Sequence, residues 1–131
     1  MGNLDEKKKI LLVDDDEIEH DIAKNILSDK YEVYTAKSGK EALNYLYNSG
    51  FIPSLVLLDI LMPEMDGWDL FNRIKAISFL KNVPIVFLTS MNKAEGEKRA
   101  HDVGADDFIT KPYESDKLLG RIEEILEKHN L

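Results

Sequence analysis

The chain has 131 residues, with 17 basic and 25 acidic side chains and a formal net charge of −8 at pH 7. This charge excludes a generic nucleic-acid binder, because nonspecific affinity for phosphate backbones needs clustered lysine and arginine. At this length we expect one domain with one hydrophobic core. The absence of cysteine excludes disulfides, thiolate metal sites and thiol nucleophiles, so any chemistry must use oxygen and nitrogen groups.

The hydrophobic segments are too short for a membrane protein. The longest apolar stretch, residues 83–88, falls far below the roughly 18 residues that a membrane-spanning helix needs. The lysines at 7–9 precede only a brief apolar run, so no secretory signal is predicted. Residues 1–9 are polar and charged, and we interpret them as a lead-in. We therefore expect a cytoplasmic protein.

Short apolar runs alternate along the chain with longer amphipathic segments. We interpret the short runs as strands at residues 10–13, 31–36, 55–58, 83–88 and 108–110. Those at 10–13, 55–58 and 83–88 show no polar alternation, which is typical of strands buried on both faces.

Helical spacing of apolar residues appears in every segment between these runs and after the last. The residues concerned are Ile18, Ile22 and Ile26; Ala42, Leu43 and Leu46; Leu70, Phe71, Ile74 and Ile77; Ala94, Ala100 and Val103; and Leu118, Ile122, Ile125 and Leu126. Asp15 or Asp16 is suited to cap the first helix, and Ser38 with Glu41 forms a capping box before the second. Gly50 is expected to end that second helix, and the fifth helix is expected to run to the C-terminus.

Strict alternation of five strands and five helices predicts an α/β fold. Such a chain forms a doubly wound five-stranded parallel sheet with right-handed crossovers and helices on both faces. The strand order 2-1-3-4-5, the flavodoxin-like (βα)5 arrangement, suits five strands and places a crevice at the carboxyl ends of strands 1 and 3. Functional residues are therefore expected directly after those strands.

Polar side chains follow four of the predicted strands at this edge. They are Asp14, Asp15 and Asp16 after strand 1, Asp59 after strand 3, Thr89 and Ser90 after strand 4, and Lys111 and Pro112 after strand 5. Carboxylates about 4 Å apart repel by several kcal/mol at an effective dielectric near 20, so their convergence implies a cation. Oxygen-only ligands favour Mg²⁺, which often shares a phosphoryl group that Lys111 and Thr89 could bind.

Four motifs carry a resemblance to a known family. They are Ile-Leu-Leu-Val-Asp-Asp-Asp at 10–16, Leu-Leu-Asp-Ile-Leu-Met-Pro-Glu-Met-Asp-Gly at 57–67, Phe-Leu-Thr-Ser at 87–90 and Gly-Ala-Asp-Asp-Phe-Ile-Thr-Lys-Pro at 104–112. Together they resemble the receiver domain of two-component response regulators. The resemblance covers essentially residues 8–129, so we expect residues 10–131 to form a receiver domain after the lead-in at 1–9.

The resemblance implies a phosphoacceptor mechanism. Asp59 would take a phosphoryl group from the phosphohistidine of a histidine kinase, or of a histidine phosphotransfer protein, to form an aspartyl phosphate. Asp14, Asp15, Asp59 and the backbone carbonyl of Leu61 would hold Mg²⁺. Lys111 would neutralise charge on the phosphoryl group, with a cis bond to Pro112 aiming its side chain at the site.

The resemblance also implies a conformational switch. Thr89 would move to bind a phosphoryl oxygen, and Phe108 would turn inward and remodel the face formed by helix 4, strand 5 and helix 5. That face is a candidate surface for binding a second copy of the chain or a downstream effector protein. We expect the protein to make no direct contact with nucleic acid or with a membrane.

Leu61 and Met91 have apolar side chains, which cannot orient a water molecule for attack on the phosphoryl group. We therefore expect the phosphorylated form to lose its phosphate slowly.

Other functions fit the residues less well. A metal-dependent phosphohydrolase of the haloacid dehalogenase type uses an Asp nucleophile but needs an acid two residues later, where this chain has Leu61. A nucleotide or flavin module is disfavoured because the chain contains neither the G-x-G-x-x-G motif nor a Walker loop. A receiver that only docks partners is disfavoured because every expected site residue is present. The protein is thus expected to catalyse only its own phosphorylation and dephosphorylation.

The remaining polar residues have structural interpretations. Asp16 is expected to cap a helix and not to bind metal. His20, His101 and His129 lack metal-ligand spacing and are expected at the surface. Gly67 is expected to be a turn residue with a positive φ angle.

Overall fold

Five parallel strands form one sheet in the order β2-β1-β3-β4-β5, in a computed structural model that describes residues 7–48 and 51–129. This order and the parallel pairing confirm the predicted fold class. The strands are β1 (Lys8–Val13), β2 (Tyr31–Ala36), β3 (Leu55–Leu58), β4 (Ile85–Thr89) and β5 (Asp107–Thr110). The first strand begins two residues earlier than predicted, at Lys8, and the fourth begins later, at Ile85.

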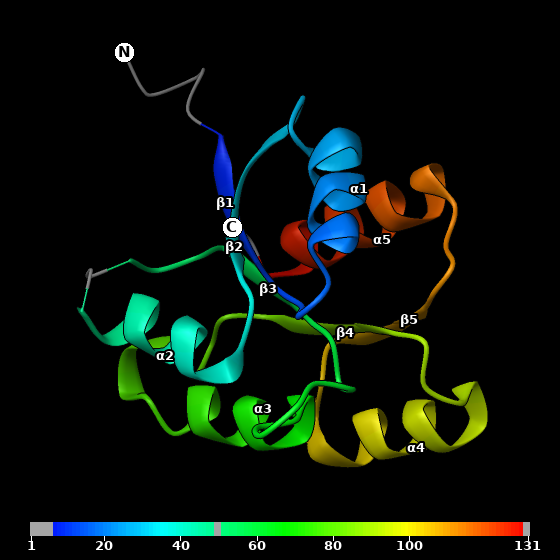
Figure 1. The fold of residues 1–131 in the computed structure, drawn as a ribbon. Coiled ribbons are helices and arrows are strands. Elements are labelled where there is room, and N and C mark those ends of the chain that lie inside the picture. Colours follow the sequence, from blue (N-terminus) through cyan, green and yellow to red (C-terminus); the bar gives the residue numbers. More distant parts are fainter. Residues whose placement is uncertain (1–6, 49–50, 130–131) are drawn as a thin grey trace.

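Helices cover both faces of the sheet, as Figure 1 shows. They are α1 (Glu17–Leu27), α2 (Gly39–Asn48), α3 (Gly67–Lys75), α4 (Lys93–Val103) and α5 (Ser115–Lys128), with a short 3₁₀ helix, η1 (Ser78–Leu80), before β4. Helices α1 and α5 lie on one face, and α2, α3 and α4 lie on the other (Figure 1). No helix in the described ranges is long and apolar enough to cross a membrane.

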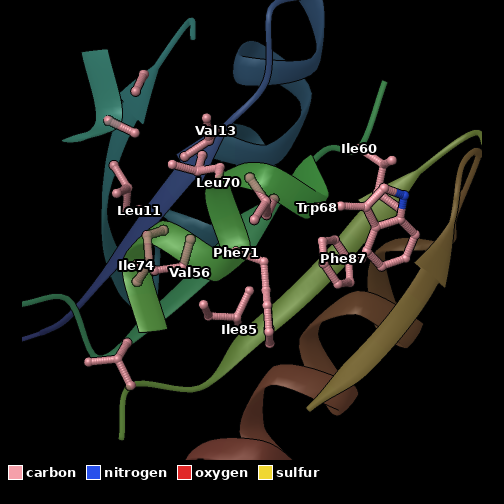
Figure 2. Close-up of a cluster of buried hydrophobic side chains, with 14 of the residues drawn as sticks. Leu11, Val13, Val56, Ile60, Trp68, Leu70, Phe71, Ile74, Ile85 and Phe87 are labelled. Carbon is pink, nitrogen blue, oxygen red and sulfur yellow. The ribbon is translucent and has the colours of Figure 1, made fainter. Parts of the chain in front are cut away.

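The sheet separates two hydrophobic clusters, which explains the continuous apolar runs. Successive strand side chains point to opposite faces, so Leu11 and Val13 join the cluster under α2, α3 and α4, whereas Ile10 and Leu12 join the cluster under α1 and α5. Figure 2 shows the first cluster, in which Trp68 packs against Phe87. Because both faces are covered, polar side chains can gather only at the strand ends.

Helix ends follow the predicted capping chemistry. The Asp16 side chain accepts a hydrogen bond from the Ile18 amide (2.9 Å) at the start of α1. The Ser38 hydroxyl accepts one from the Glu41 amide (3.0 Å) at the start of α2. The predicted end of α2 at Gly50 lies outside the described residues. Helix α5, expected to run to the C-terminus, ends at Lys128 with His129 at its C-cap.

The buried face of α1 differs from the prediction. Ile18 is 66 % exposed and Ile22 is 40 % exposed, whereas the buried residues of α1 are His20, Ala23 and Leu27. A residue two positions from His20 is turned about 200° around a helix of 3.6 residues per turn, so both isoleucines point away from the sheet. The surface position expected for His20 is therefore wrong.

Gly67 is required for a different reason from the one predicted. Among the described residues, positive φ angles occur at Glu64 (67°) and Gly104 (85°) and not at Gly67. The start of α3 instead folds back onto the end of β3, where the Gly67 amide donates to the Ile60 carbonyl (2.9 Å). A Cβ atom at Gly67 would lie 2.4 Å from the Asp59 carbonyl oxygen, so this approach admits only glycine.

We predict that Gly67→Ala destabilises the fold by about 2 to 3 kcal/mol, because the added carbon would meet backbone that cannot move without displacing β3. The control is Gly120→Ala in α5, where a Cβ has open space. That change should stabilise the fold by about 0.5 to 1 kcal/mol. Urea unfolding measures both, and equal effects would contradict the close approach.

Candidate functional site

Two carboxylates lie side by side because of the register between β1 and β3. Val13 pairs with Leu58, so the next residues, Asp14 and Asp59, leave the sheet as neighbours. The Asp59 amide donates to the Val13 carbonyl (2.9 Å), which continues the ladder. Asp14 is 1 % exposed and Asp59 is 6 % exposed. The sheet thus places two nearly buried acids at its carboxyl edge.

Asp15 completes a cluster of three acids. Asp14, Asp15 and Asp59 each offer one carboxylate oxygen, and these oxygens lie within 4.8 Å of one another. Asp15 is exposed, so the cluster opens to solvent on its side. Oxygen donors at this spacing suit a hard divalent cation such as Mg²⁺. Asp16 is engaged as the α1 cap and does not belong to the cluster.

Lys111 reaches into the cluster from the end of β5. Its ammonium Nζ lies 2.5 Å from Asp14 Oδ2, 3.3 Å from Glu19 Oε1 and 3.6 Å from Asp59 Oδ2. The peptide bond between Lys111 and Pro112 is cis. With Asp15 included, one ammonium faces four carboxylates, so the site retains excess negative charge that a divalent cation would offset.

Burial and charge shift the ionisation of the central pair. Burial raises the pKa of the Asp59 carboxyl, and the Asp14 charge adds to this rise, against the lowering effects of Lys111, the Thr89 hydroxyl and the Leu61 amide. Burial lowers the pKa of Lys111, but its hydrogen bond to Asp14 and the surrounding carboxylates outweigh burial, so the pKa is raised. Lys111 therefore stays charged, and burial and the Asp14 charge oppose ionisation of Asp59, which added positive charge would favour.

The remaining residues implied by the resemblance lie around Asp59. Thr89 is buried at the end of β4, and its hydroxyl accepts from the Met91 amide (3.3 Å). The Leu61 amide lies 3.3 Å from Asp59 Oδ1, and the Leu61 side chain is 53 % exposed.

Phe108 already lies inside the protein. Its ring is buried in the cluster under α4 and packs so tightly against Gly96 that a Cβ there would lie 2.5 Å from the ring. A switch at Phe108 would therefore move the ring within the core, because the ring has no exposed position here from which to turn inward.

The acidic cluster lines part of a cavity of about 530 Å³. Beyond the cluster, the cavity is lined by Glu19, Ile22, Ser90, Pro112 and Tyr113, among others. The Tyr113 hydroxyl is buried without a hydrogen-bond partner among the described residues, and burial raises its pKa to about 12. Sequence reasoning missed Glu19 and Tyr113, since neither belongs to a motif. Glu19 comes close to Lys111 only through the fold, and Tyr113 follows directly after the motif that ends at Pro112.

The three histidines have three different environments. His20 is buried, and its ring Nε2 lies 2.7 Å from the backbone carbonyl oxygen of Asp14. His101 is exposed, as predicted. His129 is partly buried, with its Nε2 2.8 Å from Asp106 Oδ2. Only His20 contacts a residue of the acidic cluster.

We predict that Asp59→Asn stabilises the metal-free protein at neutral pH. A raised carboxyl pKa adds stability that is fully present below the ordinary Asp value and is lost as the pH rises through the folded-state pKa. At pH 7 the wild type has lost this stability, whereas the asparagine of the variant carries no charge. The urea midpoint of Asp59→Asn in EDTA should therefore lie above that of the wild type at pH 7, and the two midpoints should coincide in acid. Asp21→Asn, on the exposed face of α1, should leave the midpoint unchanged. A lower midpoint for Asp59→Asn would contradict this account.

Comparison with known proteins agrees with the fold. The family model described as the response regulator receiver domain matches residues 10–123. The chain is 39% identical over 118 residues to the transcriptional regulatory protein CrdR of Helicobacter pylori, covering 89% of this chain and 54% of CrdR. It is 36% identical over 129 residues to the probable transcriptional regulator ycf27 of Guillardia theta, covering 98% of this chain and 49% of ycf27.

A solved structure supports the same assignment. The crystal structure of a putative response regulator from Chloroflexus aurantiacus aligns with a TM-score of 0.86 and 32% sequence identity, covering 93% of this chain and 99% of that one. By contrast, the chain spans about half the length of the curated relatives named above. With a receiver model matched along most of its length and the predicted strand order in place, this chain belongs to the response regulator receiver domains, the phosphoacceptor modules of two-component signalling.

Proposed function

We propose that Asp59 accepts a phosphoryl group from the phosphohistidine of a histidine kinase or a histidine phosphotransfer protein. The observation that carries this proposal is a nearly buried carboxylate within reach of both an ammonium and two further acids. An Asp59 oxygen attacks phosphorus as the phosphorus–nitrogen bond breaks, and the imidazole leaves with that electron pair. The product is an aspartyl phosphate.

Asp14, Asp15 and Asp59 have the donor set to hold Mg²⁺, together with the backbone carbonyl of Leu61. Bound there, the cation supplies positive charge to the phosphoryl oxygens and offsets repulsion among the acids. The excess of carboxylates over ammonium groups supports this assignment. The raised pKa of Asp59 supports it too, because added positive charge favours the ionised nucleophile.

Lys111 and Thr89 would act on the transferred group. Lys111 Nζ lies 3.6 Å from Asp59 Oδ2, so small side-chain movements bring it to a phosphoryl oxygen on that residue. Thr89 lies on the neighbouring strand with a hydroxyl that can donate. Because this chemistry consists of positioning and charge neutralisation, the protein is proposed to catalyse only its own phosphorylation and dephosphorylation.

The output would be a change at the face formed by α4, β5 and α5. Phe108 in β5 packs against Gly96 in α4, so a displacement of the ring would shift the helix. We assign this face to a homodimer or a downstream effector protein, with the effector either joined to the receiver or separate. No observation favours the alternative of a phosphohydrolase, since the position two residues after Asp59 is the apolar Leu61.

We predict that incubation with Mg²⁺ and a small acyl phosphate adds one phosphate, about 80 Da by simple chemistry, as measured by intact mass. Asp59→Asn should abolish the adduct, and EDTA should prevent it. Asp15→Asn should slow its formation by at least tenfold, since it removes one acid of the cluster. The matched control is Asp16→Asn, because asparagine keeps the α1 cap and Asp16 lies outside the cluster. An adduct that persists in Asp59→Asn would contradict the assignment.

We predict that Leu61→Asn shortens the lifetime of the phosphorylated form several-fold. The Leu61 side chain is exposed beside Asp59 and cannot hydrogen-bond a water, whereas an amide there could orient one for attack. Loss of the adduct mass over time, after the donor is removed, measures the rate. Leu61→Met is the control of similar size. A rate that stays unchanged or falls in Leu61→Asn would show that Leu61 does not limit hydrolysis.

A further inference from the structure

His20 is a buried polar side chain that the proposed mechanism does not use. It is 6 % exposed, and its ring Nε2 lies 2.7 Å from the Asp14 backbone carbonyl oxygen. A carbonyl oxygen can only accept, so Nε2 carries a hydrogen and donates it. The first turns of α1 are thereby tied to the end of β1, at the residue where the acidic cluster begins.

This bond completes a set that holds every polar atom of Asp14. The amide donates to the Ala36 carbonyl (3.0 Å), Oδ1 accepts from the Asp16 amide (2.9 Å), and Oδ2 accepts from Lys111 (2.5 Å). His20 supplies the donor for the remaining atom, the carbonyl oxygen. Among these partners, only His20 fixes the carbonyl and so the orientation of the peptide group that follows Asp14.

That peptide group leads directly into Asp15. The Asp14 carbonyl and the Asp15 Cα belong to one planar peptide group. Rotation of that group therefore changes where the Asp15 side chain leaves the backbone. The Asp15 carboxylate is exposed and has no hydrogen-bond or ion-pair partner in the part of the chain that the structure describes. Its place in the cluster therefore depends on its backbone.

We propose that His20 is a positioning residue for the metal site, which holds the Asp14–Asp15 peptide group so that both carboxylates face one cation. This inference rests on the proposed function, in which Asp14, Asp15 and Asp59 bind Mg²⁺. Without the donor, the Asp14 carbonyl would turn toward another partner and the spacing of the ligands would widen. Outer partners of metal ligands typically change metal affinity by about 10- to 100-fold when lost.

The competing account is that His20 only fills space in the core. It shares the buried face of α1 with Ala23 and Leu27, so any replacement could cost stability through packing alone. The two roles separate chemically. Glutamine keeps an N–H donor at a similar reach from the backbone, whereas leucine keeps apolar bulk and loses the donor.

The test measures the Mg²⁺ dissociation constant by isothermal titration calorimetry for the wild type, His20→Leu and His20→Gln. The unfolding free energy of each protein is measured separately in EDTA. We expect His20→Leu to weaken Mg²⁺ binding by about tenfold or more, and His20→Gln to stay within about threefold of the wild type. A positioning role predicts this pattern whatever the order of the three unfolding free energies.

Equal Mg²⁺ affinity in all three proteins would overturn the inference, as would equal weakening in both variants, which indicates packing. If His20→Leu does not fold, His20→Met, with an unbranched side chain that favours helices, takes its place under the same criteria. Failure of the wild type to bind Mg²⁺ would overturn the proposed metal site and the inference with it. Wild-type binding with unchanged affinity in the variants would overturn the role of His20 alone.

Discussion

Repulsion between carboxylates held at the ends of two adjacent strands is the constraint on which this structure depends. The pairing of Val13 with Leu58 brings Asp14 and Asp59 out of the sheet side by side, in a place where both are nearly buried. Their mutual repulsion would be relieved if the edge could splay, but apolar clusters on both faces of the sheet hold it closed. Other groups must therefore neutralise the negative charge of these two carboxylates.

Lys111 neutralises part of that negative charge. The hydrogen-bonded backbone around the acids keeps them from moving apart, so the remaining repulsion persists. Asp14 is held at each of its polar atoms, and the Gly67 amide pins the β3–α3 turn onto Ile60. The remaining negative charge lies where Asp15 opens the cluster to solvent. Under the proposed function, the same features that make the metal-free site costly would prepare it for a cation and an incoming phosphoryl group.

Much of this arrangement could be predicted from the sequence because it follows strand ends. Apolar runs locate the strands, alternation with helices determines the sheet, and the residue after each run identifies Asp14, Asp59, Thr89 and Lys111 as neighbours. Capping by Asp16 and Ser38 is also predictable, because both interactions join residues close together in the sequence.

The features that sequence reasoning missed depend on which side of an element faces the protein. The spacing of Ile18 and Ile22 indicates a helix but not its buried face, so the sequence predicts a surface position for His20, which is buried in the structure. Gly67 was identified as a required glycine, yet its reason is a close approach to Asp59 and not its own φ angle. Glu19 approaches Lys111, and comes to line one cavity with Tyr113, only after α1 and the end of β5 are packed together.

The central claim is that this edge of the sheet transfers a phosphoryl group from a phosphorylated imidazole to Asp59. The most direct test is incubation with phosphoimidazole and Mg²⁺, followed by proteolysis and mass spectrometry to locate the phosphate. The account predicts a single phosphate on the peptide that contains Asp59. A phosphate on any other residue, or no phosphate while an acyl phosphate still reacts, would contradict it.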